Sequence, residues 1–169
     1  MKKIIIIILS FPITLALYII LFSGSIKYCQ EIEIKSNIDT VIEIFDNPYN
    51  MKEYINGITD YKIISGEISK VGSKAEITFV MENNKIIMIE EIITNSLPDE
   101  KKVTYTANGV YNVVTNKFVK ISNNKTKFIK EQEFEFKGYM KIIGFFTQSS
   151  FKQQSRVYLK NFKEFIENN

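Results

Sequence analysis

Two adjacent carboxylates in the middle of the chain are the side chains best suited to acid–base chemistry. Glu90 and Glu91 lie inside an apolar run that extends from residue 86 to residue 93. Successive side chains of a strand point to opposite faces, so one of the two glutamates should face the interior. A carboxylate beside an apolar cavity has a raised pKa and can serve as an acid or a base. The structural alternative places that carboxylate at a wet sheet end or beside a lysine.

An amide in a later apolar segment is the second polar candidate. Between residues 126 and 137, Gln132 shares the even positions with three phenylalanines. If the phenylalanines face inward, Gln132 does too, and a buried amide needs hydrogen-bond partners. It could orient a polar group of a ligand, or it could satisfy a neighbouring strand. Lys130 has the same parity, and we expect its long stem to carry the amine out to solvent.

The composition excludes several kinds of chemistry. The chain contains no histidine and one cysteine, Cys29. Histidine-based triads, histidine metal sites and an intrachain disulfide are therefore impossible. We predict no cofactor and no metal, since any metal site would depend on carboxylates alone. Without Lys2 and Lys3 the remaining 20 basic and 19 acidic residues leave a net charge of +1, so no basic surface for nucleic acid is expected.

The order of the elements indicates how these side chains are positioned. After a first strand the chain has two short helices, then six strands separated by Gly, Asn and Pro-Asp turns, and finally a long amphipathic helix. An antiparallel sheet of seven strands has one apolar face, which a single long helix can cover. If the sheet curves around that helix, a space opens between them. The predicted strands are 27–35, 58–66, 73–82, 85–94, 102–108, 110–121 and 126–137. The predicted helices are 38–45, a short one that starts at residue 47 or 49 and runs through residue 55, and 149–167.

The first 25 residues do not resemble part of a soluble fold. Residues 4–22 carry no charge, and as a helix they would extend roughly 28 Å, close to the thickness of a bilayer core. We predict an N-terminal transmembrane helix within residues 1–25 and one folded domain over residues 26–169. The small residues 23–25 leave a signal peptide open as the alternative, with export after cleavage. Lys2 and Lys3 favour a single-pass membrane protein with its domain outside the cytoplasm.

Several segments resemble the START / Bet v 1-like superfamily, which includes the polyketide cyclase/dehydrase-like proteins (SRPBCC). The stretch 38–48 followed by 50–54 resembles its first helix and the motif after it, with Tyr54 where a tryptophan often stands. Residues 71–73 resemble the turn before the third strand. The segments 109–112, 131–140 and 151–155 resemble a bacterial branch, some of whose members carry a similar N-terminal anchor. The resemblance covers about residues 28–167 and implies an α+β helix-grip fold, with a cavity between the sheet and the long C-terminal helix.

The resemblance implies three kinds of function. Members bind or process hydrophobic small molecules in the cavity, while others assist protein partners. The absence of known catalytic residue sets favours binding of a hydrophobic or amphipathic molecule, such as a lipid, by a domain tethered to the membrane through residues 4–22. A cyclase or dehydratase that uses carboxylate and tyrosine groups, and a protein-interaction module, are the alternatives. The residues predicted to line the cavity are Tyr61, Phe79, Met88, Glu90, Tyr105, Gln132, Phe134, Phe151, Tyr158 and Phe162.

Overall fold

A computed structural model of the chain describes Thr14, Tyr18, residues 24–81 and residues 84–168, and every structural statement here concerns these residues. Seven strands form one antiparallel sheet in the order β1-β7-β6-β5-β4-β3-β2. The strands from β2 to β7 follow one another along the chain, and β1 pairs with β7 at the edge. Their bounds are β1 (Ser25–Ile34), β2 (Ile58–Ser65), β3 (Lys74–Met81), β4 (Asn84–Ser96), β5 (Glu100–Ala107), β6 (Val110–Ser122) and β7 (Lys125–Phe136).

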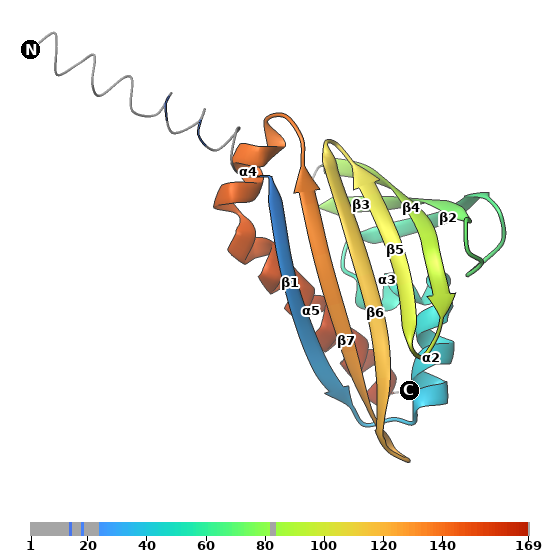
Figure 1. Ribbon diagram of the computed structural model, residues 1–169. Coiled ribbons are helices and arrows are strands. Elements are labelled where there is room, and N and C mark those ends of the chain that lie inside the picture. The colour runs from blue at the N-terminus through green and yellow to red at the C-terminus, as the bar shows by residue number, and fades with distance from the viewer. Residues whose placement is uncertain (1–13, 15–17, 19–23, 82–83, 169) are drawn as a thin grey trace, which may run out of the picture.

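The helices gather on one side of this sheet. The long α5 (Gln148–Glu167) runs behind β1 and β7, and the sheet curves away from it towards β2 (Figure 1). Three short elements follow β1: α2 (Ile38–Asp46), the 3-10 turn η1 (Pro48–Asn50) and α3 (Met51–Tyr54). Asn37 begins α2, because its side-chain oxygen accepts a hydrogen bond from the Thr40 amide at 2.9 Å. The predicted α+β arrangement, with a seven-stranded antiparallel sheet and a long C-terminal helix, is confirmed.

A tight turn fixes the register of the two central strands. Asn108 and Gly109 join β5 to β6, and both have positive φ, at 44° and 78°. Two-residue hairpin turns of this kind match the right-handed twist of the strands, and Asn-Gly is their preferred sequence. The turn therefore places Tyr105 opposite Asn112.

Aromatic rings fill one end of the space between the sheet and the helices. Phe128 of β7 and Phe162 of α5 are fully buried, with their ring centroids 5.5 Å apart. Tyr54 of α3 meets Phe162 at 4.9 Å, and Phe118 of β6 stacks on Phe128 at 4.6 Å. Phe45 of α2 contacts three of these rings edge-on. We call these five residues the aromatic core; they bind the C-terminal half of α5 firmly to the sheet.

One helix was not predicted from the sequence. The helix α4 (Met140–Phe146) lies between β7 and α5 and contacts both of them as well as β1. Two turns are too short for a clear helical period, and Gly144 in the middle lowers the helix propensity. The glycine is needed for packing, because a Cβ at Gly144 would lie 2.7 Å from the ring of Phe136.

The predicted membrane anchor lies outside the described residues, apart from Thr14 and Tyr18. Of the helices that the structure describes, none has the length and apolar composition needed to cross a bilayer. The anchor therefore stays a prediction from the sequence. The described chain resumes at Gly24, whose carbonyl accepts a hydrogen bond from the Phe136 amide at 2.7 Å.

Candidate ligand-binding cavity

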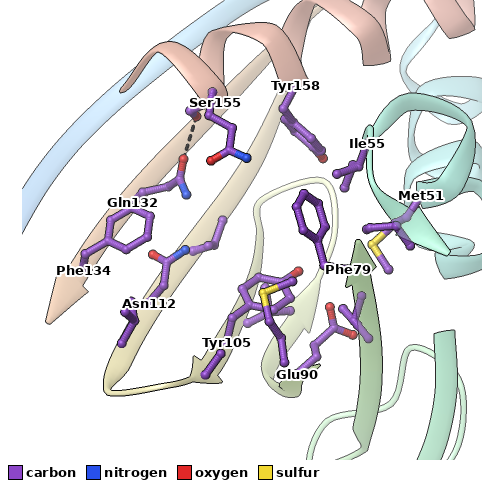
Figure 2. A pocket seen from close by; sticks show the side chains of 18 of the residues that line it. Met51, Ile55, Phe79, Glu90, Tyr105, Asn112, Gln132, Phe134, Ser155 and Tyr158 are labelled. Atoms are coloured by element: carbon purple, nitrogen blue, oxygen red, sulfur yellow. Dashed lines mark hydrogen bonds between the residues drawn. The ribbon is translucent and has the colours of Figure 1, made fainter. Parts of the chain in front are cut away.

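A cavity of about 550 Å³ lies between the inner face of the sheet and the helices α3, α4 and α5. Figure 2 shows side chains of the sheet, of α3 and of α5 converging on it, with Tyr158 of α5 facing Glu90 and Tyr105 of the sheet. The walls are mostly apolar, with a small number of polar side chains set into them. That composition is typical of sites for small organic ligands.

The cavity exists because the inward side chains of the sheet change in size from one end to the other. Beyond the aromatic core, the central strands contribute Val103, Ala107, Val110 and Val114, which are short. Ser155 is the α5 residue that faces them one turn before Tyr158. Small side chains on both walls leave a volume that no residue of the described chain occupies.

Strand register brings three polar side chains into one row on the inner face. Glu90 of β4 is paired with Tyr105 of β5, which is paired with Asn112 of β6. Residues directly opposite in antiparallel strands have Cβ atoms about 4.5–5.5 Å apart. A carboxylate, a phenol and an amide therefore lie side by side across the floor of the cavity.

Glu90 is the member of the glutamate pair that faces the interior. It is buried, and its Oε1 accepts a hydrogen bond of 3.0 Å from the hydroxyl of Tyr61 on β2. Burial raises the pKa of Tyr61 and of Tyr105, and in both cases the charge of Glu90 and a hydrogen bond with its side chain raise it further. Both phenols therefore remain protonated near neutral pH and act as donors. Glu91 points outward, where Lys74 pairs with it at 3.2 Å.

Lys130 faces the cavity instead of solvent, so the expectation from its sequence position was wrong. Its Nζ lies 4.1 Å from the ring centroid of Tyr158, and among the described residues no carboxylate forms a direct ion pair with it. Burial lowers the pKa of Lys130 to about 7, although the nearby charge of Glu90 acts in the opposite direction. The ring face of Tyr158 attracts the Lys130 ammonium but accepts no conventional hydrogen bond from it. The N–H groups of Lys130 therefore remain available to a ligand.

Two further polar positions of the wall are amides, Gln132 and Asn112. Gln132 is buried and faces inward, as its parity predicted, and its Oε1 accepts a hydrogen bond of 2.6 Å from Ser155 Oγ. This bond joins α5 to β7 within the cavity wall. Asn112 Oδ1 is also buried and accepts no hydrogen bond from the described residues. A buried acceptor without a partner costs about 1–3 kcal/mol, so Asn112 favours a ligand that carries a donor.

The ten residues predicted to line the cavity fall into two groups. Phe162 belongs to the aromatic core and does not reach the cavity. The structure places the other nine predicted residues on the cavity wall: Tyr61, Phe79, Met88, Glu90, Tyr105, Gln132, Phe134, Phe151 and Tyr158. Their contact with a ligand stays a prediction.

Lys130 and Asn112 are two polar cavity residues that the list predicted from the sequence lacks. Both carried a usable signal, because each shares its strand parity with an inward apolar neighbour, Phe128 in β7 and Val114 in β6. Lysine and asparagine are mostly found at the surface, and that expectation overrode the parity.

The cavity opens at the end of the sheet opposite the aromatic core. Four of its lining residues are exposed, and all four come from the β5–β6 turn, α4 and the first half of α5: Asn108, Tyr139, Ile143 and Gln154. We call these four residues the mouth of the cavity. A ligand entering here would pass α4 before it reached Glu90.

The lowered pKa of Lys130 makes a testable contribution to stability. The folded protein releases the Lys130 proton near pH 7, whereas the unfolded chain keeps it until about pH 10.4. Between these values the unfolded state binds more protons, so the free energy of unfolding gains a term that rises with pH. At pH 6 the wild type bears the cost of burying a charged Lys130, and at pH 9 most of that cost is gone. Lys130→Met never bears this cost, so we expect its stability relative to wild type to be higher at pH 6 than at pH 9. Chemical denaturation at both pH values measures the difference.

The matched control is Lys127→Met on the same strand. Lys127 points to the outer face, where it pairs with Glu31 at 3.4 Å. Its effect on stability should be nearly the same at the two pH values. An equal response of the two variants would contradict the lowered pKa of Lys130.

The comparisons with known proteins bear on the fold. No protein-family profile matches the chain, and none of the curated proteins does. A conserved protein from Geobacillus kaustophilus has 16% identity and a TM-score of 0.71, with 85% of this chain and 96% of that chain covered. The Zhui aromatase/cyclase from a Streptomyces species has 9% identity and a TM-score of 0.70, covering 85% and 94%.

A third similar structure was solved with small molecules bound to it. Norcoclaurine synthase from Thalictrum flavum, in complex with dopamine and hydroxybenzaldehyde, has 17% identity and a TM-score of 0.63, covering 88% of this chain and 90% of that chain. Identities this low establish the shared fold alone. Each of these matches covers at least 90% of the other chain.

Proposed function

Since this chain has the helix-grip fold of the START / Bet v 1-like superfamily, we propose that it binds a hydrophobic or amphipathic small molecule in its cavity. The observation that carries the proposal is the unfilled volume of about 550 Å³ with mainly apolar walls. Protein interiors are normally packed to a high density, so a space of this size inside the domain would be filled by side chains if it had no function. Norcoclaurine synthase, which shares this fold, has been solved in complex with the small aromatic molecules dopamine and hydroxybenzaldehyde, and this supports a ligand-binding role here.

The polar groups of the cavity suggest which kind of molecule fits. An apolar body would lie among Phe79, Met88 and Phe134. Its polar end would meet Lys130 as a donor and Asn112 as an acceptor, since neither has a full set of partners among the described residues. Glu90 is a poorer candidate for direct contact, because Tyr61 already donates to it. The proposed ligand is therefore an amphiphile whose head group accepts a hydrogen bond from Lys130, as carboxylates, carbonyls and hydroxyl groups do, and a hydroxyl group could also donate one to Asn112.

We also propose that residues 4–22 tether the domain to a membrane, with the domain outside the cytoplasm. The support is the uncharged run of 19 residues that follows Lys2 and Lys3. A lipid-like ligand would then be available in the same membrane. Alkaline extraction of membranes tests the tether: the full chain should stay in the membrane pellet, and release into the supernatant would contradict it.

Cavity filling tests the ligand proposal directly. Ala107 lies on the cavity wall near the mouth, and Thr106 is its neighbour on the opposite face of the sheet. We expect Ala107→Phe to weaken binding of a fluorescent apolar probe about tenfold, because overpacking a site costs about 1–3 kcal/mol. The matched variant Thr106→Phe should bind the probe as wild type does.

Native mass spectrometry supplies the second measurement. The full chain, extracted gently, should carry a co-purifying apolar molecule that Ala107→Phe loses and Thr106→Phe keeps. Empty spectra together with equal probe binding by the two variants would reject the proposal.

Catalysis is the second candidate, and one group of residues favours it. Lys130 has a pKa of about 7 and is close enough to Glu90 for the two charges to interact. The phenols of Tyr61 and Tyr105 lie beside Glu90 in the same cavity. A group with a pKa near the working pH is the best general acid or base. If the protein is an enzyme, the apolar molecules recovered from wild type and from Glu90→Gln should differ in chemical structure. Identical molecules from both would leave binding as the function.

A further inference from the structure

The helix α4 exposes a surface of large apolar side chains beside the mouth of the cavity. Tyr139 is 69% exposed and Phe146 is 65% exposed, and Ile143 and Phe145 between them are also exposed. We call these four residues the α4 patch. Tyr139 and Ile143 belong to the mouth as well, so the patch and the entrance share one surface. Four such side chains within eight positions are a concentration that usually marks an interaction site.

The patch lies where the predicted anchor joins the domain. The Lys141 side chain of α4 packs over Gly24, so that a Cβ at Gly24 would lie 3.2 Å from Lys141 Cε. The apolar segment 4–22 ends two residues before Gly24. A membrane that held this segment would therefore be within a few residues' reach of α4, since one residue extends at most ~3.6 Å.

The charge around the patch suits an anionic lipid surface. Residues 136–163 contain six basic residues and no acidic residue. Lys137 and Lys141 flank the patch itself, and Lys152 and Arg156 follow on α5. Basic residues close to an anionic bilayer are attracted to its negative surface potential. Aromatic and aliphatic side chains bordered by lysines are the composition of helices that lie in a membrane interface.

We propose that α4 inserts its patch into the surface of an anionic lipid bilayer, which places the mouth of the cavity against the membrane. This inference rests on the proposed function for the tether and for the ligand. Docking of α4 would let a lipid-like molecule pass between the bilayer and the cavity without crossing water. The membrane anchor alone would not achieve this, since a tether fixes the distance of the domain from the bilayer but not its orientation.

The chain has no tryptophan, so a single introduced indole reports on one position. Phe146→Trp places the reporter in the α4 patch. Val71→Trp is the matched control, because Val71 is 62% exposed in the loop between β2 and β3. That loop reaches Asp46 and Lys101, at the opposite end of β5 from the mouth. Both variants are made in the full chain and reconstituted into vesicles of phosphatidylcholine and phosphatidylglycerol with brominated acyl chains.

We expect the brominated lipids to quench the Phe146→Trp fluorescence at least about twice as strongly as that of Val71→Trp. The excess should shrink in vesicles of phosphatidylcholine alone, because the basic residues then lose their partner. Equal quenching at the two positions would overturn the inference. It would also be overturned if Phe146→Trp were quenched by the lipids only after a second protein had been added to the vesicles. If Phe146→Trp does not fold, Tyr139→Trp carries the same test.

Probe binding measured on the same samples separates the two proposals. Equal quenching with probe binding intact rejects membrane docking by α4 and leaves the ligand proposal standing. Stronger quenching of Phe146→Trp without probe binding rejects the ligand proposal and leaves α4 as a docking surface.

Discussion

Replacing Phe162 by alanine should lower the free energy of unfolding by about 3–5 kcal/mol, the range for a large buried aromatic side chain. Phe162 is fully buried and its ring meets those of Tyr54, Phe45 and Phe128 within 6 Å. The neighbours come from α2, α3 and the sheet, so they cannot collapse together into the vacated space. Chemical denaturation followed by circular dichroism gives the loss.

Phe151→Ala on the same helix is the comparison that gives this result its meaning. Phe151 is half-buried on the cavity wall, so its removal enlarges a space that already exists. We expect a loss of about 1–2 kcal/mol, which is close to its share of buried apolar area. Equal losses for the two variants would show that the interior is packed evenly along α5, and would contradict the division into core and cavity.

The second large effect concerns the head group of the ligand. At pH 6 Lys130 is mostly protonated, and an ammonium that meets a carboxylate in a poorly hydrated site forms a charge-assisted hydrogen bond. Lys130→Met keeps most of the unbranched stem of the side chain and removes its charge. We expect this change to weaken dodecanoate binding about 10- to 100-fold, because hydrogen bonds to charged groups contribute about 1.5–3 kcal/mol.

Dodecanol is the control ligand, with the same apolar chain and no charge. Its affinity, measured by displacement of a fluorescent probe, should change little in Lys130→Met. Raising the pH from 6 to 9 should weaken dodecanoate binding to the wild type, because Lys130 then loses its proton. A parallel decrease for both ligands would mean that Lys130 acts only by filling space.

The fold could be predicted from this sequence because its signals are local. Alternating polarity and turns such as Asn108-Gly109 mark the strands, and the spacing of Phe151, Tyr158 and Phe162 marks the last helix. The same signals determine which side of each element faces inward, so most of the predicted cavity residues were placed on the correct face. These local signals do not show where along α5 the aromatic core gives way to the cavity. For this reason Phe162, which belongs to the aromatic core, was predicted to line the cavity.

The arrangement of polar groups depends on information that local patterns lack. The row of Glu90, Tyr105 and Asn112 follows from the relative register of three strands, and one shifted residue would break it. Strand parity puts Lys130 on the inner face, but its amine lies over the ring of Tyr158, a contact between residues 28 positions apart in the chain that local patterns do not reveal. The helix α4 was missed for a similar reason, since its Gly144 is explained only by the ring of Phe136.

The unequal packing of α5 has a consequence for motion. Its C-terminal half is held by the aromatic core, whereas its N-terminal half borders the cavity, where Phe151 packs on Phe134 and Phe136 and hydrogen bonds run from Tyr28 to the Phe151 carbonyl and from Ser155 to Gln132. Backbone amides of residues 159–166 should therefore exchange with deuterium much more slowly than those of residues 149–155. The C-terminal half of α5 would stay in place while its N-terminal half rotates slightly about it. Such rotations would widen the mouth of the cavity while the rest of the domain stays folded.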